Sequence, residues 1–126
     1  MYEFRNPHPN GKIVGDCVKR AITIATGSDY REISRELNRI KREIGCSCFD
    51  EPNVFKEYMK RHNYEKLSFP AVKGRPRMNG ERFCESYPEG RYILSMAHHL
   101  SCCIDGVIYD TWDCSDKCVY NAYKVS

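Results

Sequence analysis

The stretch HHLSCCIDGVIYDTW, residues 98–112, carries the strongest short-range structural signal in the chain. Apolar residues flank the dipeptide Asp105-Gly106 on both sides, and Asp-Gly is a favoured sequence for a two-residue β-hairpin turn. Such a turn fixes the register of the two strands, because it sets Ile104 opposite Val107 and every outer pair follows from that one. The stretch therefore predicts two antiparallel strands with a defined pairing.

This register places a histidine and an acid on the same face of the hairpin. His99 falls opposite Trp112, and Asp110 is its diagonal neighbour, with Cβ atoms about 7 Å apart or less. That separation is within reach of a hydrogen bond between carboxylate and imidazole. His98 points to the opposite face, with Asp113 as its direct partner. We favour the pair His99–Asp110, because the opposite face carries the more regular apolar series, and we keep His98–Asp113 as the alternative.

The residues before the hairpin have helical spacing, and those after it have strand spacing. Asp16 is expected to cap a first helix that ends at Gly27, and Ser28 a second that ends at Gly45; Pro52 fits the first turn of a third. The remaining expected elements are a short strand at 67–69, a short helix at 81–87, a strand at 91–95 and an edge strand at 119–125.

Helices early in the chain and antiparallel strands late in it are typical of the α+β class. We therefore expect the N-terminal helices to pack on one face of a C-terminal antiparallel sheet. Residues 1–15, rich in Pro, Gly and Asn, are expected to form an ordered or semi-ordered arm. A length of 126 residues fits one domain spanning 1–126.

Composition argues against several classes of partner. The formal net charge of +3 is too small to indicate nucleic acid by itself, and the basic loop KGRPRMNG at 73–80 has no interleaved aromatic residues. No apolar run approaches the roughly 20 residues of a membrane span. The N-terminal stretch MYEFRNPHPNGK has no apolar signal core, so we expect a cytoplasmic protein. No motif suggests an organic cofactor.

One of the eight cysteines stands in a setting that favours chemistry. Reduced thiols are the default in the cytoplasm, so catalysis or metal binding has to be considered for them. Cys17 is expected in the first turn of a helix, where free N–H groups and the partial positive charge stabilise a thiolate. The other cysteines are expected in mid-strand, in a short helix or after a helix end, where this support is absent.

Cys17, His99 and Asp110 together suggest acyl transfer. The thiolate would attack a carbonyl carbon, the imidazole would move the proton, and the acid would orient the ring. The oxyanion would be stabilised first by the backbone N–H of Cys17, since helix starts carry unpaired amides. A side-chain amide upstream, Asn10 or Asn6, is the candidate for a second donor.

Two stretches of the chain resemble small papain-like proteins of phages and bacteria. They are GDCVKRAITIATG at 15–27 and the pattern GRYIL, HHL and DGVIYDTWD within 90–113, about a third of the chain. The resemblance implies a minimal papain-like fold with Cys17, His99 and Asp110 as its triad. It also implies a protein or peptide substrate, with peptidase activity first and amidase or transglutaminase-like transfer next. The glutamine that papain-like enzymes place before the cysteine has no match between Asn10 and Asp16.

Two other interpretations remain open at this stage. Four cysteines could supply thiolates to a zinc ion, although neither pair has the common C-x₂-C spacing; they are Cys46, Cys48, Cys114 and Cys118. Alternatively, the chain could be a papain-like scaffold without strong catalysis that binds or disables a host protein. A catalytic protein needs a hyperreactive Cys17 that depends on His99, whereas a binding scaffold would tolerate Cys17→Ala.

Overall fold

Four helices and six strands follow one another along the chain. The structure is a computed structural model that describes all residues from 1 to 126. The elements are β1 (Tyr2–Phe4), α1 (Cys17–Thr26), α2 (Tyr30–Ile44), α3 (Pro52–Arg61), β2 (Glu65–Ser68), α4 (Gly80–Ser86), β3 (Arg91–Met96), β4 (His99–Ile104), β5 (Val107–Asp110) and β6 (Val119–Lys124).

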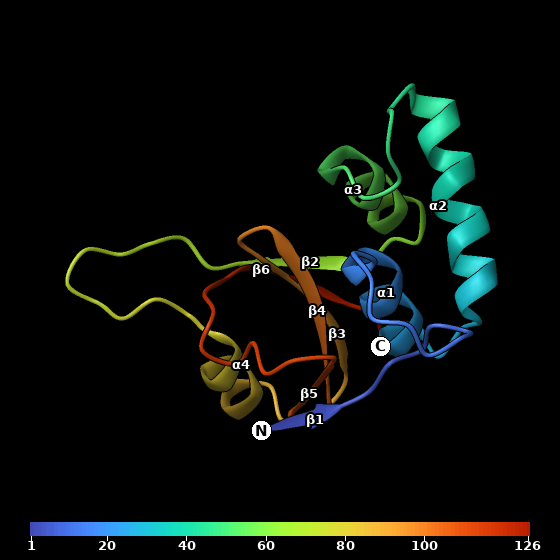
Figure 1. Cartoon of the computed structure of the whole chain (residues 1–126). Helices are drawn as coiled ribbons and strands as arrows, with labels where there is room; N and C mark the ends of the chain where they lie inside the picture. The colour runs from blue at the N-terminus through green and yellow to red at the C-terminus, as the bar shows by residue number, and fades with distance from the viewer.

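The strands form one mixed sheet in the order β1-β5-β4-β3-β6-β2 (Figure 1). The hairpin β4–β5 has the register that the sequence predicts, with Ile104 opposite Val107 and Cys103 opposite Ile108. The expectation that the last strand lies at an edge is wrong, because β6 pairs with β3 on one side and with β2 on the other. Alternation along a strand reports its buried face, and it does not report how many neighbours the strand has.

The N-terminal segment contributes a strand that the sequence did not predict. β1 runs parallel to β5, so the sheet is mixed rather than purely antiparallel. The Ile108 N–H donates to the Met1 carbonyl at 3.0 Å, and the Arg5 N–H donates to the Asp110 carbonyl at 2.9 Å. The expected arm therefore begins with a strand, and it lacks helices and strands only between β1 and α1.

The helix ends follow the expected stop signals more closely than the expected caps. Gly27 and Gly45 both adopt the left-handed conformation, with φ of +70° and +76°, directly after α1 and α2. The cap of α2 is Asp29 rather than Ser28, because the Asp29 carboxylate accepts from the N–H groups of Arg31 and Glu32. Pro52 occupies the first turn of α3, as predicted. No helix is both long and apolar enough to cross a membrane.

The sheet carries a hydrophobic cluster on each face, which differs from the expected single helical layer. The helices α1, α2 and α3 lie on one side of the sheet and α4 lies on the other (Figure 1). Leu100 and Cys102 of β4 face the first three helices, whereas Cys103 faces Phe83 and Cys84 of α4. Because β4 is buried on both faces, each face needs its own cover.

The short elements around α4 are displaced from their expected positions. β2 begins two residues before the expected strand, and α4 begins one residue before the expected helix. The side chain of Asn79 caps α4 by accepting from the Arg82 N–H at 2.8 Å. Gly80, the first residue of α4, lies so close to β5 that a Cβ atom would stand 2.7 Å from Ile108 Cδ1. This close approach fixes α4 against the sheet.

Candidate functional site

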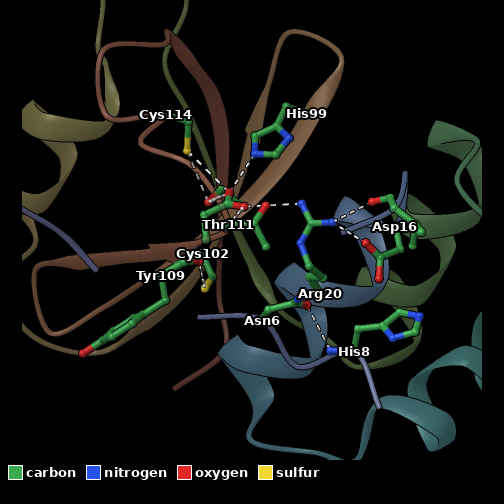
Figure 2. A network of polar contacts seen from close by, with 12 residues as sticks. Asn6, His8, Asp16, Arg20, His99, Cys102, Tyr109, Thr111 and Cys114 are labelled. Carbon is green, nitrogen blue, oxygen red and sulfur yellow. Dashed lines mark hydrogen bonds and ion pairs between the residues drawn. The ribbon is translucent and has the colours of Figure 1, made fainter. Parts of the chain in front are cut away.

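His99 and Asp110 form a buried hydrogen-bonded pair at the open end of the β4–β5 hairpin. His99 Nε2 lies 2.8 Å from Asp110 Oδ2, and their side chains are only 8% and 3% exposed. The Trp112 ring packs beside the imidazole, with ring centroids 4.9 Å apart. The diagonal contact expected from the hairpin register is therefore present (Figure 2).

Cys17 faces this pair from the start of α1. The backbones of β4 and β5 pair only next to the turn, at Cys103–Ile108 and Ile104–Val107. Beyond those pairs, β5 no longer covers the edge of β4, so the Leu100 backbone is free to hydrogen-bond to the Cys17 thiol. The Cys17 side chain is half-buried. Cys17 and His99 both line a cavity of about 530 Å³.

The surroundings of Cys17 favour its thiolate form. Burial alone raises the pKa of the thiol, but hydrogen bonds from His99 and from the Leu100 backbone act in the opposite direction. The positive charges of His99 and Arg20 add to this effect, and the net pKa of Cys17 lies below its ordinary value. The sulfur is therefore prepared for nucleophilic attack, because the thiolate is the reactive form of cysteine.

The imidazole of His99 favours its protonated form. Burial lowers its pKa, but hydrogen bonds to Asp110, Cys114 and Cys17 outweigh burial and raise the pKa to about 11. Since Nε2 is bonded to Asp110, Nδ1 is the ring nitrogen that remains for proton exchange with Cys17. The lowered pKa of Cys17 and the raised pKa of His99 together favour a thiolate–imidazolium pair.

Asp110 is held by donors from several directions. Ser101 Oγ donates to its Oδ2 at 2.7 Å, and the Thr111 N–H donates to its Oδ1 at 2.7 Å. Cys114 Sγ lies 3.6 Å from Oδ2. Burial raises the pKa of Asp110, but the hydrogen bonds from His99 and Ser101 reverse that and hold the pKa below its usual range. The carboxylate is therefore ionised at neutral pH.

A buried arginine, which the sequence analysis missed, also reaches Asp110. Arg20 Nη2 lies 3.4 Å from Asp110 Oδ1, and its Nη1 forms an ion pair with Asp16 (Figure 2). Asp16 also accepts from the Tyr30 hydroxyl at 2.7 Å. Asp16 occupies the N-cap position of α1, as expected, but its carboxylate makes no cap hydrogen bond and pairs with Arg20 instead. A charged residue among the apolar positions of α1 was the available signal.

The asparagines expected in the oxyanion hole lie elsewhere. Asn6 Nδ2 donates to the Lys12 carbonyl at 3.0 Å, and Asn6 Oδ1 accepts from the His8 N–H at 3.1 Å. Asn10 is exposed and lines a different hollow, beside α2. Both expectations are corrected, since these residues belong to turns of the arm, where asparagine is common for local reasons.

The side-chain amide that does line the cavity of Cys17 belongs to Asn121 of β6. Its Oδ1 accepts from the Ser68 hydroxyl at 3.2 Å, and its Nδ2 donates to no protein group. The sheet order brings Asn121 near Cys17 across most of the chain length. No local pattern in the sequence marks that proximity.

The alternative pair of His98 and Asp113 does not form. His98 lies in the turn between β3 and β4, with φ of +52°, and its side chain is exposed at the cavity rim. Asp113 is bonded to the N–H and hydroxyl of Ser115, at 3.0 and 2.6 Å. His98 precedes the first residue of β4 and Asp113 lies beyond the last residue of β5, so neither lies on a strand of the hairpin.

The proposed four-thiolate zinc set is not gathered in the structure. Cys46 and Cys48 follow α2, far along the chain from the buried Cys114, and the one group of three possible ligands is His99, Asp110 and Cys114. Within that group, His99 Nε2 and Asp110 Oδ2 are 2.8 Å apart. Two ligands of tetrahedral zinc at bonds of about 2.0–2.1 Å stand about 3.3 Å apart, so this contact is a hydrogen bond.

The arrangement combines a thiolate, an acid–base ring, an orienting carboxylate and an open cavity, which are the parts of nucleophilic catalysis at a carbonyl carbon. Any assignment has to rest on that geometry. Comparison with models of known protein families, with curated proteins and with solved structures finds no match for this chain.

Proposed function

We propose that this protein is a cysteine hydrolase with a papain-like arrangement of parts. It acts on an amide, isopeptide or thioester carbonyl, and a peptide bond is the first choice of substrate. One observation carries the proposal: His99 contacts both the Cys17 thiol and the Asp110 carboxylate at the wall of an open cavity. That geometry matches the roles of nucleophile, base and orienting group.

The reaction follows from the protonation states of the pair. The Cys17 thiolate attacks the carbonyl carbon, and the imidazolium of His99 gives its proton to the leaving amine as the C–N bond breaks. The product of this step is a thioester on Cys17. Neutral His99 then takes a proton from water, which attacks the thioester; the C–S bond breaks and the thiolate–imidazolium pair is restored. Asp110 orients the ring throughout.

The cavity offers contacts suited to a peptide chain. The N–H of Cys17 begins α1 and is directed to no backbone carbonyl, so it is the proposed first donor to the oxyanion. The amide of Asn121 is a further donor to substrate in the same cavity. Phe55 and Met96 supply apolar walls, and charged residues of the segment leading into α3 stand at the rim.

We also propose a reducing compartment, such as the cytoplasm, as the place of action. All eight cysteines are free thiols, and the reaction requires Cys17 to remain reduced. A protein or peptide is the proposed partner.

The first test is the reactivity of Cys17 toward iodoacetamide as a function of pH. Mass spectrometry of peptides measures the labelling rate of Cys17, with the exposed Cys48 as the internal reference thiol. We expect Cys17 to be labelled faster than Cys48 at pH 6 to 7, and His99→Ala to abolish the difference. Cys17→Ser provides the blank. Labelling of Cys17 with an ordinary thiol pKa of about 8.5 would contradict the proposal and favour a binding scaffold.

The second test traps the intermediate. The protein is mixed with a panel of peptide anilides, isopeptides and peptide thioesters, quenched in acid and weighed as intact protein. We expect an acyl adduct on Cys17 that is lost on incubation at neutral pH and is absent in Cys17→Ser. Release of product without any Cys17-dependent adduct or dependence on His99 would be incompatible with the mechanism.

A further inference from the structure

Arg20 is a buried cation one helical turn after Cys17. Its side chain is 7% exposed, and its partners are the Asp16 carboxylate, the Val14 carbonyl at 3.1 Å and Asp110 Oδ1 at 3.4 Å. Figure 2 shows the guanidinium between Asp16 and the hairpin. The group therefore connects the helix that carries the nucleophile to the strand that carries the orienting acid.

The fold alone gives no reason for a charge at this position. Arg20 lies among the buried apolar residues of α1, next to Val18 and Ala21, and its Nε has no hydrogen-bond partner. Removing charges from water is costly, and buried ion clusters are often no more stabilising than apolar side chains of similar volume. A buried arginine with an unsatisfied nitrogen is therefore better explained by a task at the site.

The charges of the site identify that task. Around one imidazolium on His99, the active form holds the Cys17 thiolate and the Asp110 carboxylate, and a third anion, the Asp16 carboxylate, is paired with Arg20. A carboxylate beside the ring orients it well, but its negative charge also opposes ionisation of a nearby thiol. A second cation in contact with the carboxylate removes that opposition without disturbing the hydrogen bond to the ring.

We propose that Arg20 is a positioning residue that neutralises Asp110, so that Asp110 can orient His99 without suppressing the Cys17 thiolate. This inference rests on the proposed function. Arg20 acts through Asp110 and is not itself expected to touch substrate. Asp16 and Tyr30 hold the guanidinium in place, since Asp16 bridges Arg20 and the Tyr30 hydroxyl.

The ionisable groups that face this cluster come from every element packed around it. They are Tyr2 of β1, Asp16 before α1, Cys17 of α1, Tyr30 of α2, His99 of β4, Asp110 of β5 and Cys114 after β5, with Asp50, Glu51, Lys56 and His98 around the cavity. The tests below leave all these groups unchanged except Asp110, which is replaced in one double variant.

The experiment measures the pH midpoint of Cys17 alkylation in Arg20→Gln. We expect the midpoint to rise by about one pH unit or more, because the Asp110 carboxylate then lacks its cation and opposes ionisation of the thiol. Adding Asp110→Asn to this variant should return the midpoint toward that of the wild type. The asparagine oxygen can still accept the hydrogen bond from His99, but the negative charge that Arg20 balanced is gone.

A matched control removes Arg91 of β3, which contacts the other end of α1. Arg91 Nη1 donates to the carbonyls of Ile24 and Ala25 at the end of α1, at 3.4 and 3.3 Å. We expect Arg91→Gln to leave the midpoint unchanged. Arg20→Lys, which keeps the charge, should stay close to the wild type. Arg20→Met removes the charge and fills similar space, so it replaces the glutamine variant if that variant fails to fold.

Three outcomes would overturn the inference while the proposed function stands. They are a wild-type midpoint in the uncharged Arg20 variants, an equal shift in Arg91→Gln, and a shift that Asp110→Asn does not reverse. An ordinary thiol midpoint in the wild-type protein would instead overturn the proposed function, and the role of Arg20 with it. Circular dichroism of each variant establishes that the fold is kept.

Discussion

At the scale of single residues, the candidate site combines the charges of Cys17, His99 and Asp110, which are shielded from water by burial. The pKa of Cys17 is below its ordinary value and that of His99 is raised to about 11, so the thiolate–imidazolium pair exists between these two limits. Burial opposes the charged form of both Cys17 and His99. Several hydrogen bonds and neighbouring charges together outweigh the free-energy cost of burying these charges.

The raised pKa of His99 predicts how stability depends on pH. A group that binds its proton more tightly in the folded state stabilises the fold fully below its unfolded pKa of about 6.5. This contribution is lost as the pH rises toward about 11. We expect the difference in unfolding free energy between the wild type and His99→Gln to be larger at pH 6 than at pH 10. Urea titrations at both pH values measure it, and a difference that stays constant or grows with pH would contradict the assignment.

At the scale of elements, the contact between α4 and β5 leaves no room for a side chain at Gly80. A Cβ atom on Gly80 would stand 2.7 Å from Ile108 Cδ1 and 3.0 Å from the backbone of Ser115. We predict that Gly80→Ala lowers the free energy of unfolding by about 1–3 kcal/mol, the usual cost of overpacking.

Gly15→Ala is the matched control for this prediction. A Cβ atom on Gly15 would meet nothing within 4 Å, so we expect a change within about 0.5 kcal/mol. Urea denaturation of both variants measures the contrast. Equal effects of the two substitutions would show that the approach of α4 to β5 is not tight.

The elements that the sequence predicted well are those whose signals are local. The turn at Asp105-Gly106 determines the pairing of β4 with β5, and Gly27 and Gly45 end their helices through their own backbone conformations. The contact between His99 and Asp110 follows from the same turn. Each of these features depends on residues close together in the chain.

The features that the sequence did not predict depend on distant contacts. β1 is a strand because β5 offers it a free edge, and β6 lies inside the sheet because β2 covers its second edge. Arg20 is in place because Asp110, on a strand 90 residues later, faces it. Asn6 and Asn10 were expected at the site from proximity along the chain, which the fold does not preserve in space.

At the scale of the whole molecule, the candidate site joins residues from the early part of the sequence to residues from the late part. Cys17 comes from the first helix, whereas His99 and Asp110 come from the late hairpin. β1 joins these regions, since the N–H of Arg5 donates to the carbonyl of Asp110 and the Tyr2 hydroxyl approaches the same carbonyl at 3.2 Å. The first strand therefore supports the strand that carries the orienting acid.

Arg5→Pro tests this support, because proline has no backbone N–H to donate. We expect a loss of about 0.5–1.5 kcal/mol in unfolding free energy, the value of one hydrogen bond, and faster amide exchange at Ile108. Arg5→Ala is the control, since it removes the guanidinium that stacks on the Tyr109 ring but keeps the donor. If the alanine variant exchanged as fast as the proline variant, the side chain rather than the strand would be responsible.

The inner position of β6 also bears on how the molecule comes into being on the ribosome. The ribosome synthesises Cys17 early and His99, the proposed base, some eighty residues later. β6, the strand that lies between β2 and β3, is synthesised after both. Until that strand leaves the exit tunnel, β2 has no neighbour to pair with and the wall of the cavity that holds Asn121 does not exist. A nascent chain thus carries the Cys17 sulfur before the rest of the candidate site exists, and the order of translation delays the proposed chemistry until β6 has joined the sheet.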